Sequence, residues 1–258
     1  MSNNIVRQLT PEEQELLCKR KELSILQAEL AERELFLANL QGELGAFEGR
    51  YLREIGTLYA ELDDWNAKIA EFAAAADGSE EAKSAAAEAR GRADESNATA
   101  HGNAAKSADF SPSPYLKKLF REVVRQIHPD NAADEEDRAE RNRLMTDANL
   151  AYRRGDEDAL LRIMDEYRNS PEAVKGAGAM ADLQRILRQI ERIVKRIAQI
   201  DSEVAALNNS EIALLMATVK TGAAKGRDLF AKMKKDLQSR IDLSQREFDD
   251  LLSNRGAR

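Results

Sequence analysis

An apolar residue recurs at every seventh position through most of the first 72 residues, and this repeat constrains the fold more than any other feature. A second apolar residue follows most of these positions by three or four residues. A sustained seven-residue repeat keeps one seam of a helix facing a partner helix, as in a left-handed coiled coil. We therefore predict an N-terminal coiled coil over residues 1–72. The first set is Leu16, Leu23, Leu30, Leu37, Leu44, Tyr51, Leu58, Trp65 and Phe72; the second is Leu26, Leu40, Phe47, Ile55, Leu62 and Ile69.

A second seam of the same kind lies in the C-terminal part of the chain. Its apolar positions alternate spacings of three and four and pause at residues 208–210. They resume with Ile212, Leu215 and Val219 and continue after Gly222 and Gly226. This pattern predicts a C-terminal coiled coil over residues 178–254. Two pairings stay open: the two coiled coils pair with each other in antiparallel fashion, or they pair across a homodimer. The seam begins with Leu183, Ile186, Ile190, Ile193, Ile197, Ile200, Val204 and Leu207, and ends with Phe230, Met233, Leu237, Ile241, Phe248 and Leu252.

The segment from residue 73 to residue 113 is rich in alanine, glycine and serine, and Phe110 is its one large apolar residue. Such a segment buries too little apolar surface to offset the entropy of ordering it. We therefore predict a flexible linker over residues 73–113 with a transient helix near residues 80–93. His101 lies within this linker, where we expect it to be solvated.

Composition and charge exclude several classes of protein. The formal net charge is −7, which argues against a nucleic-acid binder. The single cysteine, Cys18, excludes an intramolecular disulfide and a multi-cysteine zinc site. No window has the roughly 18 apolar residues of a membrane span, and the first residues lack the apolar core of a secretion signal. We expect a cytoplasmic protein with no membrane partner and no cofactor.

A compact helical unit is predicted over residues 114–169, between the linker and the second coiled coil. Its first helix, PYLKKLFREVVRQIH, carries one continuous apolar face at helical spacing. A basic stripe occupies another face of the same helix, although the chain as a whole is acidic. The apolar face is Leu116, Leu119, Phe120, Val123, Val124 and Ile127, and the basic stripe is Lys117, Lys118, Arg121 and Arg125.

This helix should end at the tripeptide His128-Pro129-Asp130. Proline has no N–H to donate and disfavours helical geometry in the residue before it. Asp134 and the acids after it can cap and begin a return helix, which Gly155 should end. We expect two antiparallel helices with His128 and Asp130 exposed at the tip, and a short third helix after Asp156.

With these residues, the unit resembles the J domains of DnaJ-type cochaperones. The stretch LKKLFREVVRQIHPD is similar to the basic helix and His-Pro-Asp loop of that family, and ANLAY, with Asn149, Ala151 and Tyr152, is similar to its Asn-x-Ala-Tyr signature. The resemblance covers roughly residues 114–168. The family's first helix is missing, because SADFSPSP occupies its place. Part of a coiled coil or the helix after Gly155 must therefore replace it in the packing.

The resemblance implies a function without enzymatic activity. J domains dock on a DnaK-type chaperone, the basic helix meeting an acidic surface and the tripeptide triggering ATP hydrolysis. By resemblance, Lys117, Lys118, Arg121 and Arg125 would dock, and His128, Pro129 and Asp130 would stimulate hydrolysis. The coiled coils would then recruit a client protein or form a homo-oligomer.

Other interpretations of the tripeptide remain open from the residues alone. Pro129 can simply end a helix, in which case the chain is a coiled-coil scaffold with a non-functional J-like hairpin. A metal site at His128 and Asp130 lacks nearby histidine or cysteine ligands, and a catalytic His128 lacks a nucleophile. Overall, the sequence predicts an all-α protein in which long coiled-coil helices flank a small J-domain-like helical hairpin.

Overall fold

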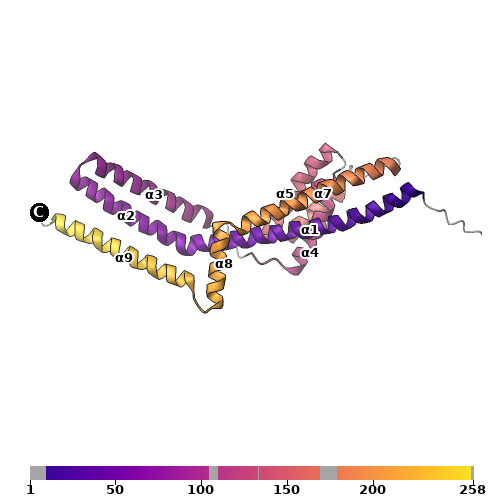
Figure 1. Ribbon diagram of the computed structural model, residues 1–258. Helices are drawn as coiled ribbons and strands as arrows, with labels where there is room; N and C mark the ends of the chain where they lie inside the picture. Colours follow the sequence, from indigo (N-terminus) through magenta and orange to yellow (C-terminus); the bar gives the residue numbers. More distant parts are fainter. Residues whose placement is uncertain (1–9, 105–109, 133, 169–178, 257–258) are drawn as a thin grey trace, which may run out of the picture. The chain divides into compact units, whose positions relative to one another are not determined.

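The computed structural model describes residues 10–104, 110–132, 134–168 and 179–256, and within these ranges every regular element is helical (Figure 1). The predicted all-α fold is confirmed. The elements are α1 (Pro11–Tyr51), a π-helical turn (Leu52–Gly56), α2 (Thr57–Asp77), α3 (Glu80–Ala104), α4 (Pro114–Ile127), a 3₁₀ turn (Pro129–Asn131), α5 (Glu135–Arg154), α6 (Glu157–Arg168), α7 (Ala179–Asn208), α8 (Glu211–Ala224) and α9 (Leu229–Gly256).

The chain divides into two compact units, and α1 supplies residues to both. The first unit comprises residues 1–42 and 110–208, and the second comprises residues 43–109 and 209–258. Each unit has buried apolar clusters of its own. No described helix combines the length and the hydropathy needed to cross a bilayer.

In the first unit, α1 pairs with α7 along the predicted seam, and the two helices run parallel. Leu30 and Leu37 pack against Ile193 and Ile200, and the start of α1 packs against the start of α7. The ion pairs follow the same order, since Arg20 meets Asp182 and Arg33 meets Asp201. The antiparallel alternative is therefore wrong: the long chain segment between the two helices lets both run in one direction.

The same unit contains the hairpin of α4 and α5, closed by α6 and by α1. The six predicted apolar residues of α4 are all buried, together with Leu144, Tyr152 and Leu160. Ala31, Leu35 and Ala38 of α1 belong to this core. Part of the coiled coil thus packs against the hairpin and completes its apolar core.

In the second unit, α2 pairs with α9, again in parallel. Ile55 and Leu62 pack against Leu237 and Ile241, and Trp65 contacts Phe248 with ring centroids 5.8 Å apart. The seven-residue repeat is therefore continuous in sequence but changes partner, from α7 in the first unit to α9 in the second.

The predicted flexible linker is wrong over residues 73–77, which belong to α2, and over residues 80–104, which form the helix α3 packed against α2. The helix predicted near residues 80–93 lies within α3, but it is packed and not transient. Ala67, Ala89 and Ala93 are buried together at the contact, because alanine combines high helix propensity with a side chain small enough for close approach. Arg90 of α3 pairs with Asp64 and Glu71 of α2, both at 2.7 Å.

Several predicted boundaries fall outside the described residues. Residues 105–109 belong to the predicted linker. Residue 169 is the last of the predicted hairpin unit, and residue 178 is the first of the predicted C-terminal coiled coil. Residues 1–9 of the predicted N-terminal coiled coil are also outside the described ranges.

Candidate functional site

A serine cap and two prolines determine where the helix α4 begins and ends. The Ser113 side chain accepts the Leu116 N–H at 2.9 Å, and Pro114 occupies the first helical position, where its missing N–H is no loss. The last residue is Ile127, as the proline two positions later requires. Because its apolar face is buried in the first unit, α4 turns its basic stripe away from the core.

The four basic residues of this stripe differ in what they contact. Arg121 pairs with Glu32 of α1 at 2.7 Å, and Arg125 pairs with Glu122 at 3.6 Å. Within the described part of the chain, neither Lys117 nor Lys118 lies within ion-pair distance of a carboxylate. The stripe therefore keeps its two lysines available to an acidic surface.

The tripeptide forms a tight turn rather than an open loop. Pro129 begins a single 3₁₀ turn in which the Asn131 N–H donates to the His128 carbonyl at 3.0 Å, and the Ala132 N–H donates to the Pro129 carbonyl at 3.1 Å. Asp134 then caps α5 by accepting the Asp137 N–H at 3.0 Å. The predicted stop and return are confirmed, and the turn fixes the direction of both helices.

Arg141 of α5 fastens the two helices together at this turn. Its guanidinium donates to the Gln126 carbonyl at 2.8 Å and to the His128 carbonyl at 3.4 Å, so it satisfies acceptors at the end of α4. It also pairs with Asp137 at 2.7 Å and contacts the Tyr167 side chain. With 7% of its surface exposed, Arg141 is a buried structural cation that the sequence did not reveal.

Asn149, Ala151 and Tyr152 lie further along α5 and have different surroundings. Tyr152 is fully buried against Phe120, with ring centroids 4.4 Å apart, and its hydroxyl donates to Asn39 of α1 at 2.8 Å. Burial raises the pKa of Tyr152 to about 12. Ala151 is also buried, whereas Asn149 lines a pocket beside the tripeptide.

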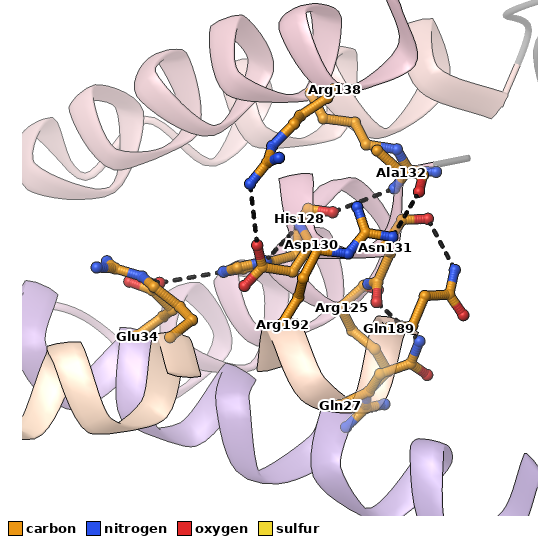
Figure 2. A network of polar contacts seen from close by, with 12 residues as sticks. Gln27, Glu34, Arg125, His128, Asp130, Asn131, Ala132, Arg138, Gln189 and Arg192 are labelled. Carbon is orange, nitrogen blue, oxygen red and sulfur yellow. Dashed lines mark hydrogen bonds and ion pairs between the residues drawn. The ribbon is translucent and has the colours of Figure 1, made fainter. Parts of the chain in front are cut away.

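The prediction that His128 and Asp130 are exposed is wrong, because α1 and α7 cover the tip of the hairpin (Figure 2). His128 is 2% exposed and Asp130 is 8% exposed. The His128 Nδ1 accepts the Asp130 N–H at 3.2 Å, so Nε2 carries the ring proton and donates to Glu34 of α1 at 3.1 Å. The sequence could not indicate this contact, since Glu34 lies 94 residues away.

Glu34 is the central charge of this arrangement. It is 4% exposed and accepts both from His128 and from the Nε of Arg196, which is 2.8 Å away on α7. Burial raises the pKa of the Glu34 carboxyl, but these two hydrogen bonds and the Arg196 charge outweigh burial and leave the pKa below its ordinary value. The carboxylate therefore stays ionised and paired inside the unit.

Asp130 is less completely satisfied. Within the described residues, its buried Oδ2 has no hydrogen-bond partner, and Arg138 approaches Oδ1 only to 3.9 Å. A pocket of about 520 Å³ lies beside the carboxylate and is lined by Pro129, Asn142 and Asn149 among others. A buried carboxylate oxygen without a donor is costly, so this oxygen is suited to a cation or donor that enters the pocket.

Asn131 and Ala132, which follow the tripeptide, are held by both paired helices (Figure 2). Gln27 of α1 donates to the Asn131 side chain at 3.0 Å, and Gln189 of α7 donates to the Asn131 carbonyl at 3.2 Å. Arg192 of α7 donates to the Ala132 carbonyl at 3.2 Å. The sequence did not single out Gln27, Gln189 or Arg192, because polar residues beside a helical seam carry no distinguishing pattern.

Among the described residues, no group of three or more histidine, cysteine, aspartate or glutamate side chains is placed to hold a metal ion. Comparisons with known proteins add no identity: no family model, no curated protein and no solved structure matches the chain.

Proposed function

We propose that the chain is a J-domain cochaperone that docks on a DnaK-type chaperone and stimulates its ATP hydrolysis. The observation that carries this proposal is the hairpin itself. A basic helix, a tight His128-Pro129-Asp130 turn and an antiparallel return helix with a buried Tyr152 form one packed unit. The buried, unsatisfied oxygen of Asp130 also supports it, because a cationic or donor group on a partner would relieve that cost.

Docking would use Lys117, Lys118, Arg121 and Arg125, and stimulation would use the tripeptide. Complementary charge orients an encounter and speeds association, which suits a stripe facing away from the core. In this proposal both proteins are cytoplasmic. The chaperone hydrolyses the ATP, and the cochaperone itself is not an enzyme.

The coiled coils would recruit a client protein or mediate self-association. Their seams are occupied within the chain, so these roles would fall to apolar side chains outside the seams. Leu17, Ile25 and Phe36 of α1 are more than half exposed, at 51%, 61% and 55%.

The test is single-turnover ATP hydrolysis by the DnaK-type chaperone of the same organism. Addition of the intact protein should accelerate hydrolysis, and His128→Gln should abolish the acceleration. His101→Gln is the matched control, because it makes the same substitution at the chain's other histidine. Absence of acceleration by the intact protein and by every variant would contradict the proposal.

One observation favours a second function, a coiled-coil scaffold whose J-like hairpin is a packing element. The burial of His128 against Glu34 is what a purely structural role would produce. In that case His128→Gln leaves self-association intact, whereas polar substitutions at the exposed Leu17, Ile25 and Phe36 destroy the assembly. Light scattering and crosslinking of these variants distinguish the two functions.

A further inference from the structure

A stripe of polar residues on α7 lies across the end of the His-Pro-Asp turn. Gln189, Arg192 and Arg196 are spaced three and four residues apart, so their side chains leave α7 on one face. Gln189 and Arg192 donate to the carbonyls of Asn131 and Ala132, both at 3.2 Å. Two members of the stripe thus bind the backbone immediately after the tripeptide.

The third member of the stripe acts on the tripeptide through Glu34. Arg196 donates to the same oxygen of Glu34 that accepts from His128, at distances of 2.8 Å and 3.1 Å. A buried carboxylate needs such a cation to remain ionised. Arg196 therefore stabilises the acceptor that holds the imidazole.

The contacts that α7 makes with the hairpin differ in kind from those of α1. Ala31, Leu35 and Ala38 of α1 are part of the hairpin's apolar core, so α1 cannot leave without exposing that core. Among the described residues, this core contains no side chain of α7. The helix α7 itself stays on α1, because Ile193 and Ile200 are buried in the seam with Leu30 and Leu37. Hydrogen bonds and ion pairs between partly exposed groups exchange with water at low cost, so the polar side chains of α7 can release the turn while the seam stays closed.

The helix α1 also satisfies part of the basic stripe with acids of its own. Glu32 pairs with Arg121 at 2.7 Å, and Glu34, two residues later, accepts from His128. In the proposed function, Arg121 would contact an acidic surface of the chaperone and His128 would stimulate its ATP hydrolysis. The chain therefore supplies an internal competitor in the middle of the proposed docking helix and another just after its last residue.

We infer that the polar face of α7 is an autoinhibitory clasp: Gln189, Arg192 and Arg196 hold the His-Pro-Asp turn closed until these side chains release it. That the clasp inhibits stimulation of a chaperone rests on the proposed function. The contacts that form the clasp lie within the first unit and do not depend on that function. In the closed state His128 is inaccessible to any partner. Release of Gln189, Arg192 and Arg196 opens one side of the turn, while the hairpin core stays intact on α1.

The test removes the polar side chains of the clasp and leaves the apolar residues of the seam and of the hairpin unchanged. The triple variant Gln189→Ala, Arg192→Ala, Arg196→Ala is compared with Arg188→Ala, which removes an exposed arginine from the same helix. Acylation of His128 by diethylpyrocarbonate is followed by peptide mass spectrometry, which separates His128 from His101. The triple variant should react roughly tenfold faster than the intact protein, given the net value of lost hydrogen bonds to charged groups, and Arg188→Ala should react at the original rate.

The same proteins are then tested for stimulation of the chaperone. A clasp predicts that the triple variant reaches half-maximal stimulation at a several-fold lower concentration than the intact protein. If the triple variant is acylated faster but none of the proteins stimulates the chaperone, the result supports the clasp and overturns the proposed function. Equal acylation rates in the triple variant and the intact protein overturn the clasp. If circular dichroism shows that the triple variant is unfolded, the single variants Gln189→Ala and Arg192→Ala provide the same comparison.

Discussion

Glu34 shows how a single carboxylate can be kept charged inside a helical core. Burying an ionised carboxylate without a partner is strongly unfavourable. Here an imidazole and a guanidinium approach one oxygen, at 3.1 Å and 2.8 Å, and together they offset the lost hydration. The stability that Glu34 contributes therefore depends on its charge.

Low pH should reveal this dependence. Burial raises the pKa of Glu34, but the hydrogen bonds from His128 and Arg196 outweigh burial and leave it below the ordinary value of 4.5. A carboxyl with a lowered folded pKa stabilises the fold above its unfolded pKa, and that stability is lost as the pH falls through the folded pKa. In urea unfolding, the intact protein should lose stability more steeply below pH 4.5 than Glu34→Gln does.

An exposed glutamate provides the control for that measurement. Glu48→Gln should follow the intact protein at every pH, because Glu48 is exposed. If the curves of Glu34→Gln and the intact protein run parallel below pH 4.5, the Glu34 charge does not stabilise the fold.

Two glycines of α1 should respond oppositely to the same substitution. A Cβ at Gly42 would overlap the ring of Phe110, whereas a Cβ at Gly45 would meet nothing within 4 Å. Gly42→Ala should therefore cost roughly 1 to 3 kcal/mol through overpacking. Gly45→Ala should stabilise the protein by up to about 1 kcal/mol, since alanine is the better helix former. Thermal unfolding of both variants tests the prediction, and a stabilised Gly42→Ala would contradict it.

At the scale of the element, the α4–α5 hairpin depends on one buried cation as much as on its apolar core. Arg141 caps the carbonyls at the end of α4 and pairs with Asp137, so it links the two helices at the turn. Its carboxylate partner has a side chain only 7% exposed. Removal of Arg141 would leave that carboxylate and the end of α4 without their shared cation.

Arg141→Met should accordingly destabilise the first unit by roughly 3 to 5 kcal/mol, the usual cost of breaking a buried ion pair from one side. Arg143→Met is the matched control, because Arg143 lies two residues away with its side chain 49% exposed. Its ion pairs with Glu140, Asp147 and Glu166 are solvent-exposed, so that variant should change the unfolding free energy by about 1 kcal/mol or less. Chemical denaturation measures both values, and equal effects of the two substitutions would disprove the structural role of Arg141.

The sequence predicts this hairpin well because its signals are local. Ser113, Pro129, Asp134 and Gly155 set the helix ends through caps and backbone restrictions that act within a few residues. It did not predict the covered tip of the hairpin, because Glu34 and the α7 stripe reach it from distant parts of the chain. For α3 the sequence predicted only a transient helix near residues 80–93, because its packing uses alanine, which apolar periodicity does not distinguish from a linker.

At the scale of the whole molecule, the seven-residue repeat specifies a seam but not the partner of that seam. Leu30 and Ile55 belong to one continuous repeat, yet the first packs with Ile193 of α7 and the second with Ile241 of α9. Parallel pairing, antiparallel pairing and pairing between chains all satisfy the same spacing. The choice comes from the segments between the helices and from side-chain fit, which the period does not encode.

This division predicts that the two units lose structure separately. Ile193 and Ile241 are both fully buried, each in a cluster confined to its own unit. Truncation of a buried isoleucine to alanine typically costs about 2 to 5 kcal/mol. Ile193→Ala should therefore speed hydrogen exchange in α4, α5 and α7, and Ile241→Ala should speed it in α2, α3 and α9.

Each variant serves as the control for the other, because the substitution is the same and only the unit differs. Mass spectrometry of peptides from the two units measures exchange in both after a single labelling. Since α1 supplies residues to both units, its peptides before Gly42 should follow Ile193→Ala and those after it should follow Ile241→Ala. Equal acceleration in all helices by either variant would show one cooperative unit and would contradict the division.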